Sequence, residues 1–238
     1  MPKKNLKRCA GFTLIELLVT MALTMLVVVS MYSVFESSNK NYSIQEQVIE
    51  AENNLRAAMS LLSYDLKSAG YDPEGPDGLI EKFGLFPIDT AETTTITFNR
   101  ADDQNGDGTM DRVETVTYSL VDGELKRQID VSQEVSGATS VVSGGNQTVA
   151  ENIEKVEFYY YNDVASPPAN PADDVASPPA NPAEIRTITV SVLAVTAHPD
   201  RSFGSQTFIP ASGVEWDTPP GHRGRFISAT VYCRNMGL

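Results

Sequence analysis

Residues 103–114 carry oxygen-bearing side chains at the spacing that a calcium-binding loop requires. The run DQNGDGTMDRVE fits the pattern D-x-[DN]-x-[DN]-G-x5-E at every specified position. Calcium takes about six to eight oxygen ligands from a tightly turned loop, and Gly108 permits such a turn. The expected ligands, with Thr109 acting through its backbone carbonyl, are Asp103, Asn105, Asp107, Thr109, Asp111 and Glu114.

The segments that flank residues 103–114 are rich in threonine and valine, which predicts strands on both sides. We therefore expect a calcium loop on a β-hairpin and not a helix–loop–helix module, with a weak, structural Ca²⁺ site. A side chain on a strand can point away from the loop, which leaves the reach of Glu114 open. The alternative is an acidic turn that joins two strands without a metal.

Glu16 is the second chemically unusual residue, because it is the only charge in the apolar run 12–35. A helix of about 20 apolar residues spans a bilayer, and a carboxylate within lipid costs on the order of 3 kcal/mol. Four cations lie within residues 1–11 and none follows until Lys40. This bias predicts a cytoplasmic N-terminus and an exported C-terminal part.

A cleavable secretory signal or a plain membrane anchor are alternative interpretations of the same run. The run is longer than the usual signal-peptide core of about 7–15 residues, and it continues without a break into a second helical stretch. Neither alternative gives Glu16 a partner, although an intramembrane charge needs one.

The hexapeptide GFTLIE at residues 11–16, after a short basic leader, resembles the processing site of type IV pilins and type II secretion pseudopilins. The resemblance implies that a prepilin peptidase cleaves between Gly11 and Phe12 and that the new N-terminal residue, Phe12, is methylated. It also implies that the amine of Phe12 pairs with Glu16 of a neighbouring subunit during assembly. Such a pair is strong in a low-dielectric environment.

Residues 12–69 contain neither glycine nor proline, and Gly70 and Pro73 follow directly. This pattern predicts one long helix that ends near Gly70. Apolar residues then recur at helical spacing, at Ile44, Val48, Ala51, Leu55, Ala58 or Met59, Leu62 and Leu66. They predict a stripe along the second half of the helix that packs under a folded head.

The residues after Gly70 are β-rich, which predicts an α+β fold with the long helix packed on an antiparallel β-sheet head, as in pilins. The expected strands are 93–99, 113–121, 124–129, 153–161, 185–197 and 225–233. The expected organisation is a leader at 1–11, a helix at 12–69 that spans the membrane at about 12–35, and a globular head at 70–238. A duplicated DVASPPANPA segment predicts an exposed Pro/Ala loop at 163–183.

The composition excludes several classes of function. Removing the four cations of the leader from the net charge of −13 leaves a body of −17, which would repel nucleic acid. Two cysteines exclude a disulfide scaffold, and Cys233 alternates with apolar residues, which predicts a buried, inert thiol. His198 and His222 lie in loops without a nucleophile motif or a second metal ligand, so no enzyme is expected.

The order of several head segments resembles PilW-type minor pilins: LRAAMSLLSYDLKSAG, the acidic loop with ETVTYSLVDGELKRQ, IEKVEFYYYN, EIRTITVSVL and ISATVYCRN. This resemblance implies a low-abundance subunit that primes a type IV pilus or stays at its tip. Its partners would be other minor and major pilins, the prepilin peptidase and the inner-membrane assembly platform. Before assembly it would cross the bacterial inner membrane once, with the head exported.

Two alternatives remain open at this point. A minor pseudopilin of a type II secretion system shares the same helix, peptidase site and Glu16. A membrane-tethered, calcium-stabilised adhesion module would need no filament and no role for Glu16.

Overall fold

The computed structural model describes residues 12–75, 78–135, 138–162 and 182–236. The leader and almost all of the predicted Pro/Ala loop lie outside the described residues. The chain divides into two compact units, residues 1–46 and 47–238. Helix α1 (Leu14–Lys67) contributes residues to both.

The described part of the first unit is the N-terminal portion of α1, and its apolar side chains are exposed. By length and composition α1 is sufficient to cross a membrane, a test that a signal sequence near an N-terminus would also pass. The expected helix 12–69 differs from α1 by two residues at each end. Thr13 caps the N-terminus, and residues 68–70 form a turn.

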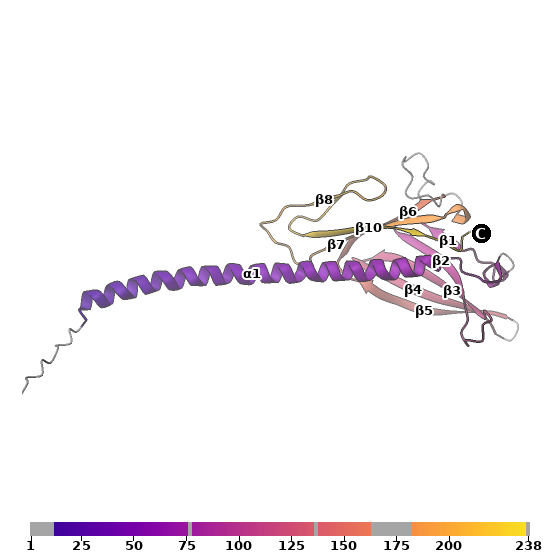
Figure 1. Cartoon of the computed structure of the whole chain (residues 1–238), viewed down its shortest axis with the longest axis horizontal. Helices are drawn as coiled ribbons and strands as arrows, with labels where there is room; N and C mark the ends of the chain where they lie inside the picture. Colours follow the sequence, from indigo (N-terminus) through magenta and orange to yellow (C-terminus); the bar gives the residue numbers. More distant parts are fainter. Residues whose placement is uncertain (1–11, 76–77, 136–137, 163–181, 237–238) are drawn as a thin grey trace, which may run out of the picture. The chain divides into compact units, whose positions relative to one another are not determined.

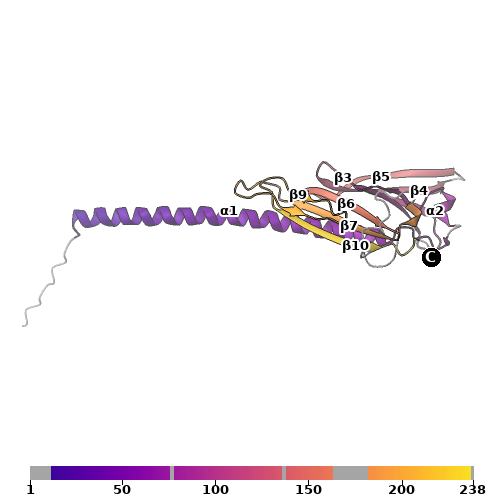
Figure 2. The ribbon, with the colours of Figure 1, turned by 90° about the horizontal axis from the view of Figure 1, so that it is seen from above.

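The second unit contains two antiparallel sheets and residues 47–67 of α1 (Figures 1 and 2). The larger sheet has the order β1-β2-β3-β4-β5. Its strands are β1 (Ile88–Ala91), β2 (Thr95–Asp102), β3 (Arg112–Val121), β4 (Glu124–Val135) and β5 (Ala138–Ala150). The short helix α2 (Leu79–Lys82) precedes β1.

The smaller sheet has the order β10-β7-β6, and all of its pairings are antiparallel. Its strands are β6 (Ile153–Tyr161), β7 (Thr187–Val195) and β10 (Gly224–Tyr232). A short 3-10 helix, η3 (Pro182–Glu184), leads into β7. A two-stranded ribbon, β8 (Thr207–Phe208) with β9 (Trp216–Asp217), lies between β7 and β10 in the chain.

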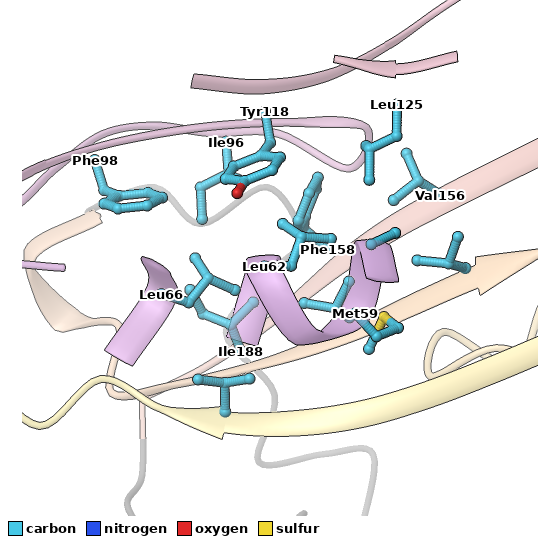
Figure 3. Close-up of a cluster of buried hydrophobic side chains, with 14 of the residues drawn as sticks. Met59, Leu62, Leu66, Ile96, Phe98, Tyr118, Leu125, Val156, Phe158 and Ile188 are labelled. Atoms are coloured by element: carbon cyan, nitrogen blue, oxygen red, sulfur yellow. The ribbon is translucent and has the colours of Figure 1, made fainter. Parts of the chain in front are cut away.

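One hydrophobic core joins the end of α1 to both sheets. In Figure 3, Leu62 and Leu66 of α1 lie between Phe98 and Tyr118 of the larger sheet and Ile188 of the smaller one. Val156, Phe158 and Tyr160, which alternate along β6, also enter this core. Cys233 is buried in the same core, and its burial raises the pKa of the thiol to about 12.

Two groups of contacts close the C-terminal end of α1. Gly70 has φ of +71°, and its N–H donates to the carbonyl of Asn99 over 2.8 Å. The side-chain amide of Asn235 donates to the carbonyls of Lys67 and Ala69 at 3.3 and 3.4 Å. The two bonds from Asn235 satisfy carbonyls at the helix end that otherwise lack donors. A Cβ at Gly70 would lie 3.1 Å from Cβ of Pro87, so the position requires glycine.

The α+β prediction, with a long N-terminal helix packed on antiparallel strands, is confirmed. The strand predicted at 153–161 matches β6, and those near β3, β7 and β10 differ from the observed strands by at most two residues at either end. The strand predicted at 124–129 continues to Val135, and β2 is shifted toward Asp102. Strands β1, β5, β8 and β9 were not predicted. Strand β5, which contains the stretch Ser143-Gly144-Gly145, forms through pairing with β4.

Candidate functional site

The first candidate site is the beginning of α1, where Phe12 and Glu16 are both exposed. Oγ1 of Thr13 accepts a hydrogen bond from the backbone N–H of Glu16 over 3.3 Å. This Thr-x-x-Glu spacing is typical of a capped helix start, where a carboxylate in the first turn is favourable. Glu16 therefore has a local helix-stabilising role that the sequence analysis did not anticipate. Gly11 lies outside the described residues.

The surface around Phe12 and Glu16 is an unbroken apolar one. Large apolar side chains of residues 12–35 are more than half exposed, and Phe12 is 82% exposed. Among the described residues, no basic side chain is paired with Glu16. An apolar helix surface of this extent requires lipid or other apolar helices around it.

The predicted calcium loop connects β2 to β3, so the expected β-hairpin setting is confirmed. The two carboxylate oxygens of Asp103 accept the backbone N–H groups of Gly106 and Gly108, each over 2.7 Å. Oδ1 of Asn105 accepts the N–H of Asp107 over 2.9 Å. Gly106 and Gly108 have φ of +75° and +91°, which allows the tight turn.

The loop is closed by its remaining candidate residues. Oδ1 of Asp107 accepts the N–H of Thr109 over 2.8 Å, and Oδ1 of Asp111 accepts the N–H of Gln104 over 3.1 Å. The N–H of Gly108, together with those of its loop neighbours, lowers the pKa of Asp103, which stays ionised. The loop thus holds five of the six predicted ligand residues in one exposed turn, and the side chains of Asp103, Asn105, Asp107 and Asp111 accept backbone N–H groups there.

Glu114 lies apart from these five residues, on β3. Its Oε2 accepts hydrogen bonds from Nε and Nη2 of Arg100 over 3.0 and 2.7 Å. Oε1 lies 3.5 Å from Nη2 of Arg112. Glu114 is thus engaged by arginine and is not in the loop. Within the described ranges, no group of three or more His, Cys, Asp or Glu residues is arranged to hold a metal ion.

An ionic cluster around Asp65 joins α1 to the larger sheet. Asp65 is fully buried, and its Oδ2 accepts hydrogen bonds from the hydroxyl of Tyr118 and Nε of Arg127, each over 2.7 Å. Its Oδ1 accepts Nη1 of Arg100 over 3.1 Å. Because Arg100 also binds Glu114, these five residues form one network, the Asp65 cluster, which connects α1 to β2, β3 and β4.

The electrostatics of the Asp65 cluster keep Arg100 and Arg127 protonated and Tyr118 neutral. Burial lowers the pKa of Arg100, but hydrogen bonds and charge from Glu114 and Asp65 outweigh this effect and raise it. The pKa of Arg127 is raised in the same way, with Asp65 outweighing its desolvation. Burial and the adjacent Asp65 carboxylate raise the pKa of Tyr118, so its hydroxyl stays a donor.

The Asp65 cluster was not predicted, although the position of Asp65 in the sequence indicates a buried carboxylate. Asp65 lies three residues after Leu62 and ten after Leu55, on the side of the helix that carries the apolar stripe. A carboxylate among core positions requires buried partners.

Residues 6–32 match the prokaryotic N-terminal methylation motif. The chain therefore carries the N-terminal signature of prepilins that are processed and methylated. Among solved structures, a type IV-like pilin from Thermus thermophilus is similar to the chain at 12% identity, with a TM-score of 0.46, over 79% of this chain and 97% of that one. No curated protein sequence matches the chain.

Replacing Asp65 with asparagine tests the cluster. Arg100 and Arg127 would lose the anion that compensates their burial, which destabilises the head by roughly 3 kcal/mol and lowers Tm by about 6–12 °C. The control is Glu52→Gln on the same helix, whose exposed pair with Arg56 contributes at most about 0.5 kcal/mol. Thermal unfolding followed by Trp216 fluorescence measures both variants. Equal melting temperatures for the two would contradict the assigned role of Asp65.

Proposed function

We propose that the protein is a minor pilin of a type IV pilus, most like PilW-type subunits, which primes filament assembly or stays at the filament tip. In this role the chain is a structural subunit and carries out no catalysis. Prepilin peptidase cleaves between Gly11 and Phe12, and the new amine of Phe12 is methylated.

The observation that carries this proposal is the position of Glu16 in the first turn of α1, within residues 12–35, whose large apolar side chains are exposed. The N-terminal match at residues 6–32 supports the processing step. Cleavage would create an ammonium at Phe12, four residues before Glu16. On staggered helices the amine of one subunit reaches the carboxylate of the next, and low dielectric makes this pair strong.

The acidity of the head supports a low-abundance subunit. A body with a net charge of −17 after loss of the leader would repel its own copies along a filament. Its partners would be other minor and major pilins, with prepilin peptidase and the inner-membrane assembly platform acting before incorporation. The chain would cross the inner membrane once, with a cytoplasmic N-terminus, and then move to the cell surface.

A minor pseudopilin of a type II secretion system is the second candidate, because the motif and α1 serve both assemblies. Deletion of the major pilin gene, compared with deletion of the major pseudopilin gene, distinguishes the pilus subunit from the pseudopilus subunit. The protein should be lost from the extracellular fraction only in the strain that lacks its own filament.

An intact mass measured on protein extracted from membranes or sheared filaments tests the processing step. We expect loss of residues 1–11 and the addition of one methyl group, because the resemblance of GFTLIE to a prepilin processing site implies cleavage before Phe12 and methylation of Phe12. An unprocessed chain, or cleavage after Ser30, would remove the amine partner of Glu16 and favour a plain anchor or a secreted module.

Replacing Glu16 with alanine tests assembly. We expect incorporation into sheared filaments to fall at least about tenfold, because the Phe12 amine loses its partner, while cleavage continues. Glu50→Ala is the matched control, since Glu50 is also an exposed carboxylate of α1. Immunoblots of sheared and membrane fractions measure both steps. Unchanged incorporation of the Glu16 variant would support the tethered-module alternative.

We further propose that the β2–β3 loop binds one Ca²⁺ weakly, as suits an extracellular structural site. Asp103, Asn105, Asp107 and Asp111 would supply side-chain oxygens, and Thr109 a carbonyl. The ligand spacing of the sequence and the presence of these residues in one tight turn support the proposal. Because Glu114 is engaged by Arg100, water would complete the coordination in place of the expected bidentate carboxylate.

Calcium-dependent melting tests this site. Millimolar Ca²⁺, but not Mg²⁺, should raise Tm of the unmodified protein by a few degrees, because ligand binding stabilises the folded state. Asp107→Asn should weaken this rise, whereas Glu114→Gln should retain it from a lower starting Tm. No effect of Ca²⁺ on the unmodified protein would exclude the site. Loss of the effect in Glu114→Gln would return Glu114 to the ligand set.

A further inference from the structure

A cavity of about 550 Å³ lies beside β6, on the face of the strand that is turned away from the core. We call it the Trp216 cavity. Four segments that are distant in the chain form it: the β1–β2 turn, the end of β3, β6, and the β8–β9 loop with the start of β9. Its principal lining residues are Thr94, Leu120, Glu157, Tyr159, Val214 and Trp216.

The aromatic wall of the cavity is held in place by other rings. Trp216 is only 7% exposed and pairs across the β8–β9 ribbon with Phe208. Its ring meets that of Phe226 edge-on, with 6.1 Å between ring centroids, and Phe226 stacks on Phe208 at 5.7 Å. The wall is therefore preformed, which lowers the entropic cost of binding.

Glu157 places a carboxylate in this apolar setting. It is 3% exposed, and its flanking residues Val156 and Phe158 point into the core. Oε1 accepts the backbone N–H of Ser212 over 3.1 Å. Within the described residues this is the single hydrogen bond of its carboxylate, and no cation lies within ion-pair distance. Ionised carboxylates buried to this degree normally have a cationic partner.

The cavity already accommodates one cation of the protein. Nζ of Lys155 lies 6.0 Å from the centroid of the Trp216 ring, at the outer range of a cation–π contact. Lys155 and Glu157 both line the cavity but form no ion pair with each other. The ring therefore attracts positive charge, while the carboxylate retains unused acceptor capacity.

We propose that the Trp216 cavity receives a lysine or arginine side chain of a partner polypeptide. The apolar stem would pack against Leu120 and Val214, and the charged end would bind Glu157 beside the aromatic rings. The strongly acidic body would attract a basic partner to this surface. This inference goes beyond filament assembly and does not depend on it.

Trp216 is the single tryptophan of the chain, so its fluorescence reports on the cavity directly. Full-length protein in detergent is titrated with N-acetyl-lysinamide and N-acetyl-argininamide, and with the neutral N-acetyl-norleucinamide as control. The two cationic probes should change the fluorescence saturably and bind with at least about tenfold higher affinity than the neutral probe. Added salt should lower the affinity of the cationic probes. Equal affinity for the neutral probe, or no saturable change with either cation, would overturn the proposal.

Two variants assign the binding to Glu157. Glu157→Gln keeps the shape of the side chain and should lower the affinity of the cationic probes at least about tenfold. Glu151→Gln removes an exposed charge outside the cavity and should leave their affinity unchanged. Unchanged binding by Glu157→Gln would overturn the proposal. If this variant does not fold, the comparison of the cationic and neutral probes on the unmodified protein tests the proposal by itself. Tighter binding of free n-butylamine than of N-acetyl-lysinamide would overturn the assignment to a polypeptide.

Discussion

The contact of Asp65 with Arg100, Arg127 and Tyr118 is the constraint on which the arrangement of the head depends. Apolar packing tolerates the exchange of one aliphatic side chain for another, so it specifies the register of a helix on a sheet less strictly than polar contacts do. A buried carboxylate with three fixed donors has one satisfactory position. The Asp65 cluster thus sets the register of α1 on the larger sheet, and the leucines around it fill the space that this register leaves.

The helix α1 carries two kinds of surface, and each follows from local sequence. Residues 12–35 are apolar around the whole circumference, which suits lipid or a bundle of similar helices. The later residues have one apolar stripe, and the structure buries Leu55, Leu62 and Leu66 of this stripe. The absence of glycine and proline between them lets a single helix serve both environments.

Much of the fold was predictable because it depends on short-range periodicity. The long helix, its end near Gly70 and the strands β6 and β7 follow from residue spacing alone. The sequence could not place β5, whose Ser- and Gly-rich residues adopt a strand because β4 offers hydrogen bonds. For the calcium loop, spacing identified the turn but not the fate of Glu114, which depends on Arg100 across the β2–β3 pair. The Trp216 cavity joins four distant segments, so no local pattern indicates it.

The bonds from Asn235 to the last turn of α1 span 166 and 168 residues of chain. The helix is synthesised at least 166 residues before Asn235, so its end cannot be closed until Asn235 is available. Its apolar stripe likewise waits for β7 and β10 before it is covered. Contacts between residues so distant in sequence form late in folding and slow it. The packing of the head around α1 is therefore complete only after β10 and Asn235 have been synthesised.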